Sequence, residues 1–108
     1  RARALLGLDA RDELYDAYLL RYPRGSGVPA HVDAAAADGH VHVRVNAIVV
    51  AAEAGGVLAI DGAVVDLDVG DAVVFRPDVD VHEVSVVDEG ARVVFSVGAL
   101  VRAATTGD

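Results

Sequence analysis

The stretch that decides the fold lies near the middle of the chain and reads VLAIDGAVV at residues 57–65. Two short apolar runs flank Asp61-Gly62, a pair that suits a two-residue turn between antiparallel strands because both positions accept a positive φ. The stretch therefore predicts a β-hairpin. Short strands separated by turns are then expected on both sides of it.

Further strands are predicted in both directions from this hairpin. Residues 40–46 alternate strictly between polar and valine side chains, which predicts a strand with two different faces. A Gly-Asp turn precedes an apolar strand at 72–75, and the last two strands are expected at 81–87 and 91–97. Six or seven short strands in a valine-rich chain predict a mainly β sandwich, barrel or jelly roll.

A single helix is expected at residues 9–20, ahead of the strands. Asp9 can cap its first turn, and apolar residues follow at helical spacing. Tyr15 and Tyr18 are interpreted as packing groups of this helix rather than as site residues.

Length and composition bound the class of protein. The chain has 108 residues, of which 54% are hydrophobic and 24% charged, so residues 1–108 are expected to form one globular domain. The absence of cysteine excludes disulfide scaffolds, zinc ribbons and thiol nucleophiles. A formal net charge of −8 disfavours nucleic acid and anionic membranes as partners.

The ends of the chain and its apolar stretches bear on localisation. No signal peptide and no membrane-spanning run is visible, so a cytoplasmic protein is expected. The chain does not begin with methionine, which is compatible with a fragment or with a chain whose record lacks some segment.

Three side chains carry a pattern typical of metal binding. His31 and Asp33 lie two positions apart, so on a strand both side chains point to the same face. His82 follows on a later strand. Two imidazoles and one carboxylate form the facial triad of non-haem Fe(II) oxygenases, which leaves open positions on the metal. The alternative is that these are polar residues at strand ends, because His-x-Asp is a common pattern.

Arg92 is a further candidate, and its orientation depends on one turn. Residues 88–90 read Asp-Glu-Gly, which suits a three-residue loop that combines a type I turn with a glycine bulge. In that register His82 lies opposite Ser96, and Arg92 points to the same interior face. A buried guanidinium needs an anion, which a dicarboxylate could supply. A two-residue loop would instead turn Arg92 outward.

The order and spacing of these residues resemble the Fe(II)/2-oxoglutarate dioxygenase superfamily, and its prolyl-hydroxylase-like branch in particular. The resemblance covers roughly residues 20–100 and implies a double-stranded β-helix, which is a jelly-roll fold. It rests on motifs in a fixed order, namely Tyr22 nine residues before His31-x-Asp33, Gly55-Gly56, Gly70-Asp71 before an apolar strand, His82, and Arg92 ten positions further on.

The resemblance also implies an activity and the roles of individual residues. It implies hydroxylation of a C–H bond of a small molecule, an amino acid or a peptide side chain, with O2 and 2-oxoglutarate as co-substrates. Arg92 would bind the far carboxylate of 2-oxoglutarate, and Tyr22 and Asn46 would line the same pocket, with Arg44 beside them. The resemblance assigns the catalytic Fe(II) ligands to His31, Asp33 and His82.

A cupin-like jelly roll that binds a metal or a small molecule without oxygenase activity is the alternative function. His40 and His42 form the His-x-His pair of a cupin site, but Asn46-Ala47 stands where such a site needs a glutamate. His40 and His42 are therefore interpreted as polar residues near a solvated or pocket-facing side of their strand.

Overall fold

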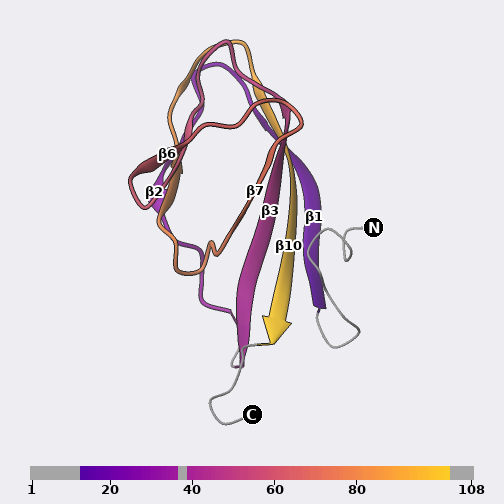
Figure 1. Cartoon of the computed structure of the whole chain (residues 1–108). Helices are drawn as coiled ribbons and strands as arrows, with labels where there is room; N and C mark the ends of the chain where they lie inside the picture. Colours follow the sequence, from indigo (N-terminus) through magenta and orange to yellow (C-terminus); the bar gives the residue numbers. More distant parts are fainter. Residues whose placement is uncertain (1–12, 37–38, 103–108) are drawn as a thin grey trace.

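The computed structural model describes residues 13–36 and 39–102, and within these ranges the chain forms β-strands and no helix (Figure 1). In chain order the strands are β1 (Glu13–Tyr22), β2 (Val28–His31), β3 (His40–Val50), β4 (Ala54–Gly55), β5 (Leu58–Ile60), β6 (Ala63–Val65), β7 (Ala72–Phe75), β8 (His82–Val84), β9 (Val87–Glu89) and β10 (Arg92–Arg102). The described part of the chain contains no helix of the length and apolarity needed to cross a membrane.

Two four-stranded sheets make up the body of the fold. One has the order β1-β10-β3-β7 and the other β2-β8-β5-β6, while β4 and β9 form a small separate pair. Figure 1 shows the long strands β1, β10 and β3 side by side, with β2 and β6 on the opposite side of the molecule. All strand pairs are antiparallel, and most neighbours in a sheet are distant in sequence. The mainly β prediction is confirmed, and this strand order is consistent with a jelly roll.

The hairpin predicted at residues 57–65 is confirmed. β5 pairs with β6 across Asp61 and Gly62, whose φ angles are 50° and 80°. Positive φ at both central positions defines the mirror-image type I turn that matches the twist of the flanking strands. The strands expected at 40–46 and 72–75 are present as β3 and β7, which pair with each other.

The prediction of an N-terminal helix is wrong for all of its residues that the structure describes. Residues 13–22 form β1, the edge strand of the first sheet, with Tyr22 opposite Arg92 of β10. Residues 9–12 of the expected helix lie outside the described residues. As a strand, this segment gains a ladder of hydrogen bonds to β10 and turns Tyr18 and Tyr22 toward the interior cavity. Long-range pairing therefore outweighs the local helical spacing.

The pairing predicted for the last two strands is also wrong. β8 pairs with β2 and β5 in one sheet, whereas β10 pairs with β1 and β3 in the other. Gly90, with a φ of 78°, lies where the chain passes from β9 to β10 rather than at the end of a hairpin. The orientation expected for Arg92 nevertheless holds, since Arg92 is 4% exposed and lines the same cavity as His82.

The core between the sheets combines an apolar shell with a polar centre. Phe75 and Val94 of the first sheet and Leu58 and Val84 of the second are buried around one cavity. Buried polar side chains normally have partners, and each one needs a physical explanation. In the described part of the chain these buried polar residues are His42, Arg44, Arg92 and Ser96.

Candidate metal centre

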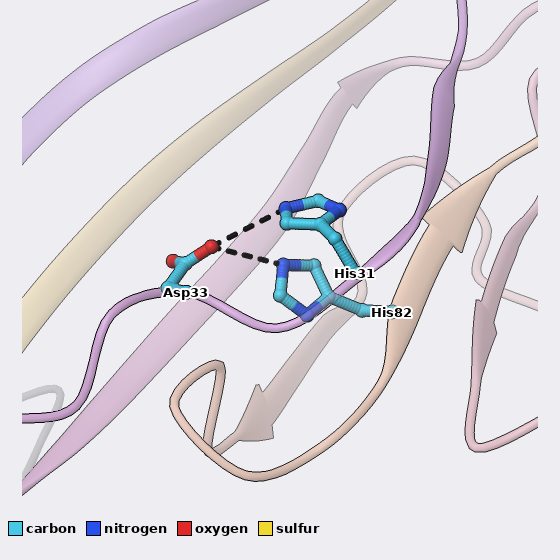
Figure 2. A group of neighbouring side chains, drawn as sticks. All are labelled: His31, Asp33 and His82. Carbon is cyan, nitrogen blue, oxygen red and sulfur yellow. Dashed lines mark ion pairs between the residues drawn. The ribbon is translucent and has the colours of Figure 1, made fainter.

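His31, Asp33 and His82 meet at one point (Figure 2). His31 ends β2 and lies opposite His82, which begins β8. The Oδ1 atom of Asp33 is 3.3 Å from Nε2 of His31 and 3.6 Å from Nε2 of His82. One possible ligand atom from each residue lies within 4.8 Å of the other two. The structure therefore brings together the three residues that the sequence predicted as metal ligands.

Backbone carbonyls hold both imidazoles through Nδ1. The Nδ1 atom of His31 is 2.8 Å from the carbonyl oxygen of Pro29, and that of His82 is 2.9 Å from the carbonyl oxygen of Asp80. An Nδ1–H that donates to a carbonyl leaves Nε2 with a free lone pair, and in both residues Nε2 is the atom beside Asp33. Metal-binding histidines are typically oriented by such an outer partner.

The donor set suits a divalent transition metal with open coordination positions. Two imidazole nitrogens and one carboxylate favour Fe(II) and related ions. The side chains of His31 and Asp33 are 41% and 39% exposed, so one side of the cluster is open. Within residues 13–36 and 39–102 no other group of three histidine, aspartate or glutamate residues could hold a metal, so His40 and His42 form no second centre there.

Arg92 lies in the same cavity without a counterion. This interior cavity has a volume of about 160 Å³ and is lined by all three cluster residues and by Arg92. The Nε atom of Arg92 has no hydrogen-bond partner, and no carboxylate of the described residues lies within 4.0 Å of the guanidinium. Burial lowers the pKa of Arg92 below its ordinary value. A buried, unpaired positive charge of this kind is costly unless an anion binds beside it.

Tyr22 and Asn46 add polar groups to the wall of this cavity. The guanidinium of Arg92 lies 5.6 Å from the ring centroid of Tyr22. Burial raises the pKa of Tyr22 above its ordinary 10.0, against the opposing effect of Arg92, so the hydroxyl stays protonated. Asn46 accepts a hydrogen bond of 2.6 Å from the Ser96 hydroxyl through Oδ1. The side-chain amide N–H groups of Asn46 remain available to donate hydrogen bonds.

A second buried guanidinium, that of Arg44, has a carboxylate partner and further polar neighbours. Its Nη2 lies 2.6 Å from Oδ1 of Asp16, and its Nη1 donates to the Ser96 hydroxyl at 2.7 Å. Nη2 also lies 3.3 Å from Nε2 of His42. Sequence reasoning missed Ser96 as a site residue and missed Asp16, which the expected helix would have placed elsewhere. A lone serine in the apolar run 93–97 is the signal that could have found Ser96.

Gly98 makes room for Arg44, which leads to a stability prediction. A Cβ at position 98 would overlap Nη2 of Arg44 and lie 2.8 Å from its Cζ. The φ of Gly98 is not positive, so Gly98→Ala carries no backbone strain of its own. We expect Gly98→Ala to lower the free energy of unfolding by about 1–3 kcal/mol, measured by urea titration. In an Arg44→Ala background the loss should largely vanish. Equal stability of Gly98→Ala and wild type would contradict this packing.

His42 leads to a prediction about the pH dependence of stability. Burial, and then the Arg44 guanidinium, lower the pKa of His42 below its ordinary 6.5. The unfolded chain therefore takes up a proton at this residue at a pH where the folded protein does not. Stability from the neutral imidazole is present above pH 6.5 and is lost as the pH falls through the lowered folded-state pKa.

We therefore expect the free energy of unfolding of the metal-free protein to decrease as the pH falls below 6.5. The decrease should be smaller in His42→Gln, because glutamine does not titrate. Urea unfolding at a series of pH values measures this, with His40→Gln as the control that removes a different histidine. Superimposable pH profiles for wild type and His42→Gln would refute the prediction.

Comparisons with known proteins bear on the fold. No protein-family model matches the chain, and no curated protein matches it either. A cupin protein from Bacteroides fragilis has a TM-score of 0.54 at 20% identity, over 98% of this chain and 77% of that one. KdgF from Halomonas sp. has a TM-score of 0.54 at 16% identity, over 82% and 76%. The fold is a cupin-type jelly roll.

A third similar structure is a prolyl-4-hydroxylase from Pseudomonas putida. Its TM-score is 0.57 at 24% identity, and the match covers 84% of this chain but 55% of the hydroxylase. This chain therefore corresponds to little more than half of that protein. At this level of identity the likeness is one of fold, and the cupin-type jelly roll is common to the hydroxylase, KdgF and the cupin protein.

Proposed function

We propose that the protein is an Fe(II)- and 2-oxoglutarate-dependent oxygenase that hydroxylates a C–H bond of a small molecule, an amino acid or a peptide side chain. The observation that carries the proposal is the unpaired, buried Arg92 in the same cavity as the cluster of His31, Asp33 and His82. A metal site alone would not explain this guanidinium. A ligand with a metal-chelating end and a distant carboxylate accounts for both features.

The residues present fit the metal that this activity requires. His31 and His82 would hold Fe(II) through Nε2, because their Nδ1 atoms are engaged by backbone carbonyls, and Asp33 would supply a carboxylate oxygen. Bound Fe(II) would supply the redox chemistry that couples decarboxylation of 2-oxoglutarate to the oxidation of a substrate C–H bond by O2.

The remaining residues of the cavity would bind and enclose the co-substrate. Arg92 would pair with the distal carboxylate in bidentate geometry, and Tyr22 and Asn46 would donate hydrogen bonds. A volume of about 160 Å³ is small beside the roughly 300–1,000 Å³ of typical ligand pockets. It suits a compact acid and leaves the substrate to bind outside it.

A cupin-like protein that binds a metal or a small molecule without oxygenase activity is the second candidate function. The fold neighbours favour it, since one of them is described as a cupin protein and the jelly roll is common to all three. On this alternative the metal cluster would still bind a divalent cation, but Arg92 would have no role toward 2-oxoglutarate.

Substrate-stimulated turnover of 2-oxoglutarate tests the proposal. The protein is incubated with Fe(II), 2-oxoglutarate and a panel of amino acids, small metabolites and short peptides, and succinate and oxygen uptake are measured. We expect turnover that requires Fe(II), ceases with a chelator and rises with at least one member of the panel. Metal binding without any turnover of 2-oxoglutarate would contradict the proposal and support the second candidate.

A further inference from the structure

A second, larger cavity adjoins the candidate metal centre. It has a volume of about 560 Å³, which falls within the range of small-molecule sites, and it is open on one side. Asp33, Arg44 and Tyr18 line both this outer cavity and the interior cavity, so they form the wall between the two. A molecule in the outer cavity would therefore lie next to the proposed metal ligand Asp33.

The polar floor of the outer cavity is a rigid, preorganised structure. The Arg44 side chain is 6% exposed and is held by Asp16, Ser96 and His42. Gly98, which has no side chain, leaves room for the Arg44 guanidinium in this position. A group bound on this floor would meet fixed partners and would pay little for ordering them.

Asp16 is the charged group that this floor presents to a ligand. Its side chain is 35% exposed, and Arg44 engages only its Oδ1 oxygen. No described residue makes a hydrogen bond to the second carboxylate oxygen. An anionic ligand would have to displace Asp16 from Arg44, whereas a hydrogen-bond donor can use the free oxygen directly.

A tyrosine ring extends the preference for a cation. Tyr15 and Tyr18 line the cavity and are 58% and 39% exposed. The Arg44 guanidinium already lies 5.2 Å from the centroid of the Tyr18 ring, so Tyr15 offers the accessible aromatic surface beside Asp16. The placement of the two tyrosines corrects the interpretation of both residues as helix packing groups. His42 adds no positive charge near neutral pH, since burial and Arg44 keep its imidazole neutral. Cations are attracted both to carboxylates and to aromatic faces.

We propose that the outer cavity is the substrate site and that it takes substrates with an ammonium or guanidinium group, which pairs with Asp16 beside the ring of Tyr15. This inference rests on the proposed function, because it names the substrate class of the same reaction. The shared chemistry could be supplied by the α-ammonium of a free amino acid or by the basic side chain of a peptide.

Four probe molecules distinguish the α-ammonium of a free amino acid from the basic side chain of a peptide. L-lysine carries both ammonium groups, L-norleucine only the α-ammonium, Nα-acetyl-L-lysine methylamide only the side-chain ammonium, and Nα-acetyl-L-norleucine methylamide neither. Binding is measured by titration calorimetry on the full chain loaded with Zn(II), without 2-oxoglutarate. We expect at least one cationic probe to bind tenfold or more tightly than the neutral one. The cationic probe that binds identifies which ammonium the site uses.

Variants place the binding at Asp16. Asp16→Asn should remove the tenfold preference, whereas Asp88→Asn, which removes the same charge from an exposed position on β9, should keep it. Tyr15→Leu should weaken binding of the preferred probe severalfold. This variant keeps the Asp16–Arg44 pair intact, so it tests the site even if Asp16→Asn does not fold. Equal binding of neutral and cationic probes by wild type, no binding of any probe at millimolar concentration, or a preference that survives Asp16→Asn would overturn the inference.

Binding of the probes is measured without turnover of 2-oxoglutarate, so the cation site and the oxygenase activity can each fail separately. Cationic probes that bind to a protein which never turns over 2-oxoglutarate would contradict the oxygenase while leaving the cation site in place. Turnover that is stimulated only by neutral or acidic substrates would contradict the cation site while leaving the oxygenase in place.

Discussion

Replacing His82 by alanine is expected to abolish both metal binding and activity. His82 supplies one of three ligand atoms that lie within 4.8 Å of one another, and its ring is held by the Asp80 carbonyl and packs edge-on against Phe75. Loss of a group that hydrogen-bonds to a metal-binding histidine typically lowers metal affinity 10–100-fold, and loss of the histidine itself should lower it further. We therefore expect the affinity for Fe(II) or Mn(II) to fall more than a hundredfold in a metal titration.

His40→Ala is the matched control, because it removes a histidine that lies outside the cluster. It should bind metal like wild type, whereas a cupin-type site that used His40 would lose the metal. Wild-type affinity in His82→Ala, or a large loss in His40→Ala, would place the metal elsewhere.

Replacing Arg92 by alanine is expected to weaken 2-oxoglutarate binding by about tenfold to a thousandfold. The guanidinium is 4% exposed, lacks a carboxylate partner among the described residues and lines the cavity that contains the metal cluster. A charge-assisted hydrogen bond contributes about 1.5–3 kcal/mol, and 1.4 kcal/mol corresponds to a factor of ten in affinity. Arg92→Lys should recover only part of the binding, because an ammonium lacks the planar fork of a guanidinium.

Metal affinity and stability serve as the controls for Arg92. Metal affinity should be unchanged in Arg92→Ala, since the guanidinium is no ligand. Arg92→Met should unfold no more easily than wild type, because it removes a buried charge without a counterion. Arg44→Met should by contrast lose about 2 kcal/mol, because Asp16 and Ser96 lose their partner. Equal affinity of wild type and Arg92→Ala for 2-oxoglutarate would remove Arg92 from the site.

Local patterns predicted much of the fold, and long-range pairing accounts for the rest. The Asp61-Gly62 hairpin and the alternating strand at 40–46 follow from turn chemistry and from a period of two, which act within a few residues. The helix at 9–20 was wrong for residues 13–20, because these residues gain more from pairing with β10 than helical spacing offers them. Strand pairing between residues that are far apart in sequence produces little recognisable pattern within a short segment of the chain.

The candidate site was predictable where neighbours in sequence act together. His31 and Asp33 share a face because they lie two positions apart. The inward orientation of Arg92 was right although its predicted partner strand was wrong, since β8 and β10 lie in different sheets. Asp16 could not be predicted as a partner of Arg44, because their contact joins β1 to β3 across β10. The backbone carbonyls that hold the two imidazoles could not be predicted either, because every residue has a carbonyl whatever its side chain.

Titration of 2-oxoglutarate into the Mn(II)-loaded protein tests the central claim most directly, namely that one cavity holds a metal at one end and a carboxylate-binding arginine at the other. Calorimetry compares 2-oxoglutarate with 2-oxobutyrate, which has the same chelating end and lacks the distal carboxylate, and repeats both titrations without metal. We predict that 2-oxoglutarate binds only with metal present and at least tenfold more tightly than 2-oxobutyrate. Equal affinities for the two acids, or no metal-dependent binding of 2-oxoglutarate, would contradict the claim.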